Sequence, residues 1–102
     1  MDISALKKLL DQGQDSVILR FGLGHALFKS GQAAEAIPHL RVAIEFDSEY
    51  SAAWKILGKA LVETGDKEEA IKVYKKGLIV ADKKGDRQAV KEINVFLKRL
   101  LK

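Results

Sequence analysis

Two histidines, His25 and His39, are the side chains of this sequence best suited to metal binding or proton transfer. They lie fourteen positions apart. A zinc-binding histidine pair on one helix needs a spacing of four with a glutamate between, and the chain has no cysteine to supply a thiolate. The spacing therefore predicts no metal site, and we expect no metal or other cofactor.

The other patterns that could support catalysis have simpler structural interpretations. The segment FGLGH at residues 21–25 contains G-x-G, but it lacks the third glycine and the preceding strand of a phosphate-binding loop. The adjacent carboxylates Glu68 and Glu69 fall at the start of a predicted helix, where they interact favourably with its dipole. No G-x-S-x-G element is present. The sequence therefore predicts that the protein is not an enzyme.

Positive charge is concentrated in the second half of the chain. Residues 1–54 hold five Lys/Arg and seven Asp/Glu, whereas residues 55–102 hold thirteen and seven, which gives the net charge of +4. This asymmetry fits an acidic protein partner or a nucleic acid, and it also fits an ordinary solvated helix surface. The aromatic residues among these lysines are few, and two of them belong to the predicted core, which does not favour a base-stacking surface.

The length and composition predict one helical domain that is soluble. A chain of 102 residues with a single proline and many Ala, Leu and Lys favours helices over strands. Its beginning lacks the basic segment and apolar run of a secretory signal. No apolar stretch approaches the ~18 residues needed to cross a bilayer. We therefore expect a cytoplasmic protein without membrane contact.

A repeat of 34 residues organises the chain. Shifting the sequence by 34 places Leu23 on Leu57 and Gly24 on Gly58. The other matched pairs are Ala26/Ala60, Leu27/Leu61, Gly31/Gly65, Glu35/Glu69, Ala36/Ala70 and Ile37/Ile71. The matches recur at spacings of three and four, stop at a glycine and then resume. This pattern predicts a helix–turn–helix unit that occurs twice.

The repeat resembles the tetratricopeptide repeat, whose pattern is W-x2-L-G-x2-Y followed by A-x3-F. Residues 51–84 contain W-x2-L-G-x2-L and then A-x3-Y, and residues 17–50 contain R-x2-L-G-x2-L and then A-x3-L. The first copy departs at Arg20, where the family prefers an aromatic residue. The whole chain also resembles the small stand-alone bacterial proteins of this family.

The resemblance implies an all-α fold, a right-handed α-solenoid of antiparallel helix pairs, in one domain of residues 1–102. Two full repeats at 17–50 and 51–84 would be flanked by an N-terminal helix within 1–16 and a capping helix within 85–102. The six expected helices cover residues 3–12, 17–30, 33–46, 51–64, 67–82 and 86–101.

Particular residues support these helices. Gly31 and Gly65 are expected to end helices in the left-handed conformation. Gly24 and Gly58 lie within helices, where glycine is costly unless two helices cross closely. The core is expected to include Leu23, Leu27, Trp54 and Leu57.

In this family the first helix of each pair lines a concave groove that holds an extended peptide. The resemblance therefore implies a protein–protein interaction module or scaffold. Carried over to this sequence, the candidate groove residues are Ile18, Phe21, His25, Phe28, Lys29, Ala52, Lys55, Lys59, Val62, Lys91, Val95 and Lys98. Asparagines that grip chaperone tails in one branch of the family would fall on His25 and Lys59, so we do not expect chaperone-tail binding.

The groove composition favours an acidic peptide with an apolar residue. Phe21 and Phe28 would lie at one end, and Lys55, Lys59 and Lys98 at the other. The alternative is that both phenylalanines simply pack against the first helix of the chain.

Two other functions remain open at this stage: a self-associating structural subunit and a basic nucleic-acid-binding protein. The apolar stripe of the last helix comprises Val90, Ile93, Leu97, Leu100 and Leu101. Val95 and Phe96 lie outside it, beside Ala89, and could form a weak homodimer contact. Alternatively, Phe96 folds back onto the preceding helix.

Overall fold

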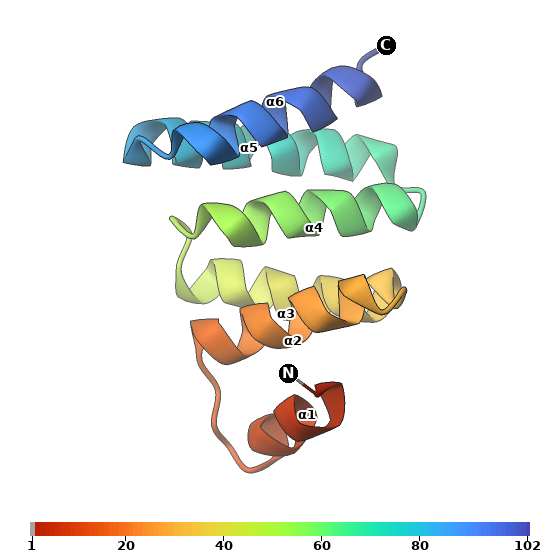
Figure 1. Ribbon diagram of the computed structural model, residues 1–102, viewed down its shortest axis with the longest axis vertical. Helices are drawn as coiled ribbons and strands as arrows, with labels where there is room; N and C mark the ends of the chain where they lie inside the picture. The colour runs from red at the N-terminus through yellow and green to blue at the C-terminus, as the bar shows by residue number, and fades with distance from the viewer. Residues whose placement is uncertain (1) are drawn as a thin grey trace.

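The chain forms six consecutive α-helices in a computed structural model that describes residues 2–102 (Figure 1). They are α1 (Ile3–Asp11), α2 (Val17–Lys29), α3 (Ala33–Phe46), α4 (Ser51–Glu63), α5 (Lys67–Lys84) and α6 (Arg87–Leu100). Every boundary expected from the sequence lies within two residues of the observed one. The all-α fold of sequential antiparallel helix pairs is confirmed.

The helix ends follow from local side-chain and backbone chemistry. The side chain of Asp66 accepts a hydrogen bond from the backbone N–H of Glu69, which caps the start of α5. Asp2, Ser16 and Asp86 cap α1, α2 and α6 in the same way. Gly31 and Gly65 have φ values of +83° and +85°, which confirms the expected left-handed helix ends.

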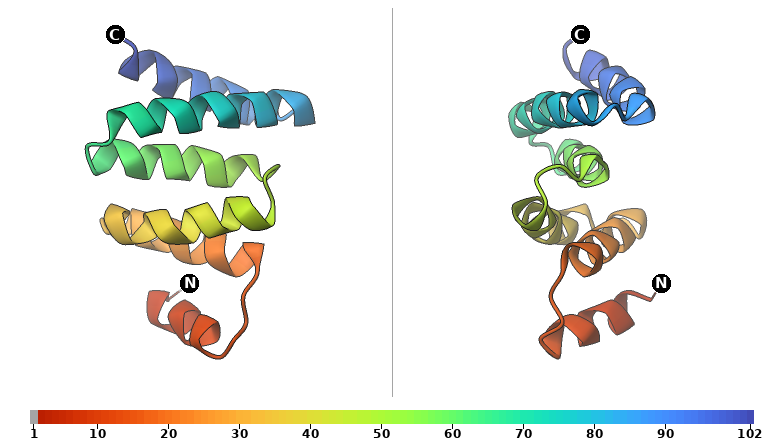
Figure 2. Two further views of the ribbon diagram at one scale, coloured as in Figure 1. Left: turned by 180° about the vertical axis from the view of Figure 1, so that it is seen from behind. Right: turned by 90° about the vertical axis from the view of Figure 1, so that its left-hand side faces the viewer.

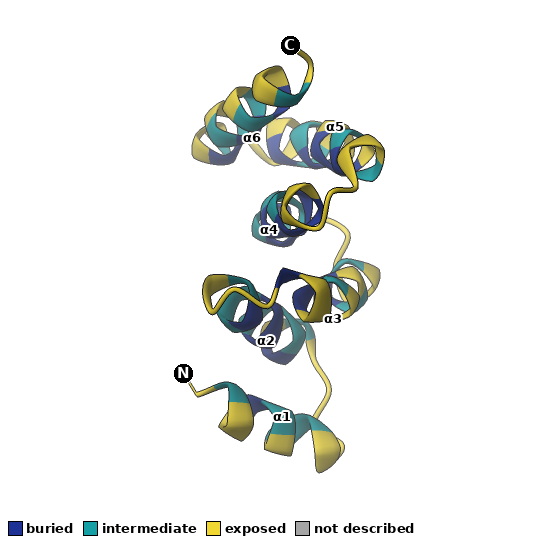
Figure 3. Ribbon diagram, turned by 90° about the vertical axis from the view of Figure 1, so that its right-hand side faces the viewer, coloured by how far each residue is buried: buried dark blue, intermediate teal, exposed yellow. Residues whose placement is uncertain are grey.

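The helices are arranged in two layers, which are seen end-on in Figure 3. We call α2, α4 and α6 the inner layer, and α3 and α5 the outer layer. In the inner layer α2 contacts α4 and α4 contacts α6, whereas the backbones of α3 and α5, both wholly described, lie apart and are bridged by the ion pair of Arg41 with Glu69. The closer spacing of the inner layer makes it the concave side. The helices α1 and α6 lie at opposite ends of the stack (Figure 2).

The core is formed mainly by leucine and alanine between the two layers. Leu23, Leu27 and Leu57 are buried, as expected. Trp54 was expected in the core as well, but it is only partly buried. Because α3 and α5 lie apart, the Trp54 ring covers α4 between them, and its indole N–H donates a hydrogen bond of 2.9 Å to the carbonyl oxygen of Ser48.

The two glycines within helices mark close crossings, as expected, but each gap is filled by a side chain. A Cβ atom at Gly58 would collide with the ring of Tyr74 on α5. A Cβ atom at Gly24 would lie 2.7 Å from Cγ of Leu40 on α3. In each repeat the missing side chain of the first helix is replaced by a large side chain of the second.

Polar contacts join the turn before α4 to the turn before α6. The buried hydroxyl of Ser51 donates a 2.8 Å hydrogen bond to Oδ2 of Asp86, and this bond holds the pKa of Asp86 below its ordinary value. Lys84 Nζ donates a 2.8 Å bond to the carbonyl oxygen of Glu49. These contacts fix α6 against the second repeat.

Within residues 2–102, no helix has the length and apolar composition needed to cross a membrane.

Replacing Gly58 and Gly22 with alanine should have opposite effects on stability. Both glycines lie within helices, but a Cβ atom at Gly22 meets nothing within 4 Å. Gly58→Ala should lower the free energy of unfolding by about 1–3 kcal/mol, because the rigid Tyr74 ring must move. Gly22→Ala should raise it by about 0.5–1 kcal/mol through helix propensity. Urea unfolding followed by circular dichroism measures both; two stabilised variants would contradict the crossing at Gly58.

Candidate functional site

Lys59 lies at the centre of the inner layer, where three helices meet. Its ammonium nitrogen is 5.6 Å from the ring centroid of Phe28 on α2 and 5.1 Å from that of Phe96 on α6. Each distance allows a cation–π interaction. One side chain of α4 therefore joins both neighbouring helices of the inner layer.

An open pocket of about 220 Å³ adjoins Lys59. We call it the Lys59 pocket; its lining residues are Phe28, Lys59, Val62, Glu63, Tyr74, Phe96, Arg99 and Leu100. Most of the lining is apolar or aromatic, with two cations and one carboxylate. The pocket can therefore hold an apolar side chain next to a negatively charged group.

Tyr74 shapes the base of this pocket. Its ring lies against Gly58 and is tilted at 32° to the ring of Phe96, with the centroids 5.9 Å apart. Burial raises the pKa of Tyr74 to about 12, so the phenol is neutral at physiological pH. The packing orients Phe96 toward Lys59.

This packing also bears on the homodimer contact expected from the sequence. Phe96 folds back onto the preceding helix, the second of the two alternatives, and Ala89 is buried. Val95 is left as an exposed apolar side chain, with 46% of its surface accessible. A single exposed valine is common on protein surfaces.

A second aromatic cluster lies on α2. The rings of Phe21 and His25 are stacked with centroids 5.6 Å apart, and Phe21 is 4.8 Å from Tyr50 at the start of α4. Burial, and then the nearby Lys29, Lys55 and Lys59, lower the pKa of His25. This shift favours the neutral form of His25 at pH 7.

Lys55 is less available to a ligand than the sequence suggested. Its ammonium nitrogen lies 3.2 Å from a carboxylate oxygen of Glu92 on α6. Such a partly exposed pair contributes little to stability, but it offsets the charge of Lys55. Arg99, which the sequence analysis did not select, brings a further positive charge to the Lys59 pocket.

On α6 the structure places other residues against the inner layer than the candidates named from the sequence. The sequence analysis selected Lys91, Val95 and Lys98, whereas the residues that meet the inner layer are Glu92, Phe96 and Arg99. One position is about 100° around a helix. This orientation follows from the buried residues of α6, Ala89, Ile93 and Leu97, which pack against the preceding helices α4 and α5.

The other expected groove residues lie in four different places. Val62 lines the Lys59 pocket, and Ala52 is partly buried. Lys29 lies with His25 in a crevice between α1 and α2. Ile18 is 77% exposed at the start of α2. The structure thus brings Phe28, Lys59 and Val62 together, and it places Phe21 and His25 in a neighbouring cluster.

The neighbours that the sequence analysis missed have a recognisable spacing. Glu92, Phe96 and Arg99 follow one another at intervals of four and three, which places them on one face of a helix.

Among residues 2–102, no group of three or more His, Cys, Asp or Glu side chains is arranged to hold a metal ion.

Comparisons with known proteins agree on one family. The sequence model of the tetratricopeptide repeat matches residues 3–51 and 21–86. The chain is 45% identical over 100 residues to the TPR repeat-containing protein PA0015 of Pseudomonas aeruginosa, and the match covers 98% of this chain and 95% of that protein.

Two solved structures show the same arrangement of helices. The solution structure of protein BPP2914 from Bordetella parapertussis has a TM-score of 0.86 and 44% identity, over 99% of this chain and 88% of that one. The crystal structure of YrrB, described as a TPR protein with an unusual peptide-binding site, has a TM-score of 0.70 and 20% identity, over 96% of this chain and 58% of that one. The second likeness concerns the fold alone.

The neutral state of His25 predicts a pH dependence of stability. The pKa of His25 is lowered from its ordinary value of 6.5 in the folded protein, so the unfolded chain takes up the proton first as pH falls. The free energy of unfolding should therefore decrease from about pH 6.5 downward, and His25→Gln should reduce this slope. Chemical unfolding at a series of pH values between 7 and 5 measures it. Equal slopes for both proteins would contradict a neutral, partly buried His25.

Proposed function

Because the chain belongs to the tetratricopeptide-repeat family, whose members generally serve as protein–protein interaction modules, we propose that it binds a peptide segment of another protein along its inner layer. The binding surface is centred on the Lys59 pocket. A partly apolar pocket with a few placed polar groups is the usual form of a ligand site. The description of YrrB as a peptide-binding TPR protein supports the same class of partner.

The observation that carries this proposal is the position of Lys59 between two aromatic rings. Phe28 and Phe96 fix the ammonium group at the floor of the groove and remove part of its hydration. A peptide carboxylate can therefore pair with a preorganised cation, which lowers the entropy cost of binding.

The ligand chemistry follows from the rest of the pocket. Arg99 places a second cation on the same side as Lys59, whereas Val62 and the two phenylalanine rings offer apolar surface. Glu63 lies at the edge and disfavours a peptide that is acidic throughout. The best ligand is a segment in which one or two acidic residues flank a leucine-like or aromatic residue.

Selection from a random peptide display library tests this function. The wild-type protein should enrich peptides that combine acidic and large apolar residues. Lys59→Met should weaken binding of the selected peptides about tenfold or more, because it keeps the aliphatic packing but removes the charge. Fluorescence anisotropy of a labelled selected peptide measures this change.

Lys67→Met is the matched control, because it removes an equal charge from the exposed start of α5. It should leave the affinity unchanged, and both variants should keep the circular dichroism spectrum of the parent. Selected peptides without acidic residues, or equal losses for both variants, would contradict the proposal.

A further inference from the structure

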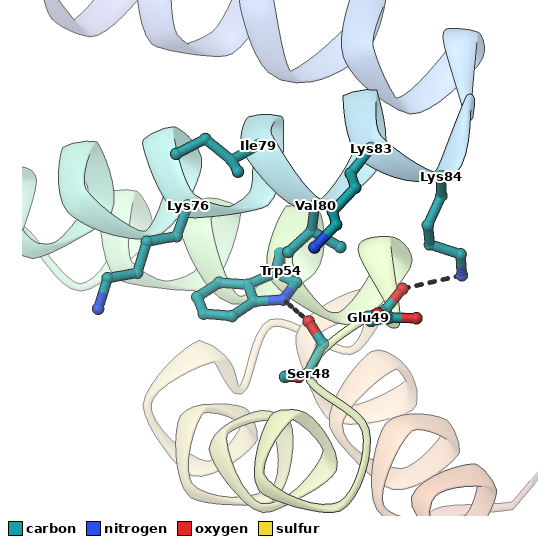
Figure 4. Close-up of a pocket in the computed structure, with 8 residues that line it drawn as sticks. All are labelled: Ser48, Glu49, Trp54, Lys76, Ile79, Val80, Lys83 and Lys84. Carbon is teal, nitrogen blue, oxygen red and sulfur yellow. Dashed lines mark hydrogen bonds between the residues drawn. The ribbon is translucent and has the colours of Figure 1, made fainter.

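A second hollow lies on the opposite side of the molecule, between the turn that follows α3 and the outer-layer helix α5 (Figure 4). It has a volume of about 310 Å³, and the ring of Trp54 forms its floor. Val80 and Ile79 of α5 add apolar surface, and 68% of the Ile79 side chain is exposed. The hollow exists because the backbones of the two outer helices lie apart and leave α4 uncovered between them. We call it the Trp54 hollow.

Three lysines and one carboxylate, Glu49, surround this apolar floor. Lys76, Lys83 and Lys84 all extend from α5 around the Trp54 ring (Figure 4). Lys84 donates its hydrogen bond to the carbonyl oxygen of Glu49. Lys76 and Lys83 form no ion pair with any residue in 2–102. Two cations are therefore free to bind an anionic group on either side of the apolar surface.

The positive charge continues along the space between the outer helices. A neighbouring hollow of about 440 Å³ shares Trp54 and Lys76, and Lys72 lines it further along α5. Its carboxylates are Glu69, which is paired with Arg41 at 3.6 Å, and Glu45. The two hollows together are lined by five Lys/Arg side chains and three carboxylates, so the elongated path that they form has a net positive charge.

The Trp54 hollow is not a general consequence of the repeat. One repeat earlier, Trp54 corresponds to Arg20, whose guanidinium binds Asp15 at 2.8 Å and lies 3.1 Å from Nδ1 of His39. Ile79 and Lys83 correspond to Glu45 and Glu49, which are acidic. The first repeat thus fills the equivalent position with an ion pair, and only the second combines an open aromatic ring with free lysines.

We propose that the Trp54 hollow is a second binding site, which takes an acidic linear segment of a partner protein. An apolar side chain of that segment packs on Trp54 and Ile79, and the flanking carboxylates pair with Lys76 and Lys83. Charge complementarity selects this occupant, because the free lysines repel a basic segment and the apolar floor gives no advantage to a purely polar one. The site lies on the face opposite the inner layer and is independent of the Lys59 pocket.

The chain itself provides the probe for this site, because Trp54 is its only tryptophan. The blocked peptide Ac-EELEE-NH2 should produce a saturable change in the emission of Trp54, and Ac-KKLKK-NH2 should produce none. Replacing the peptide leucine with glycine should weaken binding at least fivefold, since the apolar contact is lost. Peptides without aromatic residues keep the emission specific to the protein.

Two double variants make the test specific. Lys76→Glu with Lys83→Glu should weaken binding of Ac-EELEE-NH2 at least tenfold. Lys67→Glu with Lys75→Glu changes the same helix by the same charge at exposed positions outside the hollow, and it should weaken binding by less than threefold. Lys59→Met should leave this titration unchanged. A result that contradicts binding at the Trp54 hollow can therefore be distinguished from one that contradicts peptide binding at the Lys59 pocket.

Three results would overturn the proposal. The first is the absence of a saturable emission change with the acidic peptide. The second is an equal loss of affinity in both double variants, which would indicate a general effect of net charge. The third is an emission change that depends on protein concentration without any peptide. That result would show a second copy of the chain in the hollow, contributing its exposed Phe46 between Glu45 and Asp47.

Discussion

The contact between Gly58 and the ring of Tyr74 is the constraint on which the rest of the second repeat depends. Because α4 has no side chain at this position, the Tyr74 ring enters the space and sets the separation of α4 and α5. The same ring supports Phe96 of α6 and forms the base of the Lys59 pocket. Helix spacing and site geometry therefore have one cause. A change at this crossing would alter the position of α6 and, with it, the aromatic surroundings of Lys59.

The curvature of the stack gives the two faces different chemistry. Inner-layer helices contact one another, so their side chains interact across helices, as Lys55 does with Glu92 and Lys59 with two rings. The outer-layer helices lie apart, so α4 is exposed between them and the Trp54 ring forms the floor of a hollow at the surface. One and the same pair of helices can therefore contribute to a preorganised groove on its inner side and to an open hollow on its outer side. The two surfaces do not share residues and can evolve separately.

The fold was predictable from the sequence because its determinants are local and repeated. The leucine spacing, the glycines at helix ends and the 34-residue period are each set by neighbouring residues, and all three agree. The repeat supplies the register of α2 and α4, so the sequence could place Phe28, Lys59 and Val62 on one side of these helices. It could not place the residues of α6, whose orientation depends on how Ala89, Ile93 and Leu97 pack against α4 and α5. The pairing of Lys55 with Glu92 and the partial exposure of Trp54 also depend on distances between helices, which a repeat pattern does not specify.

Whether a peptide binds on the inner layer is tested most directly by NMR mapping of the backbone amide shifts. A selected acidic peptide titrated into the ¹⁵N-labelled protein should shift the amides around Phe28, Lys59 and Phe96 most strongly, on three helices that are distant in sequence but meet at one cation. Shifts confined to α3 and α5, with those three positions unchanged at saturation, would contradict the inner-layer site.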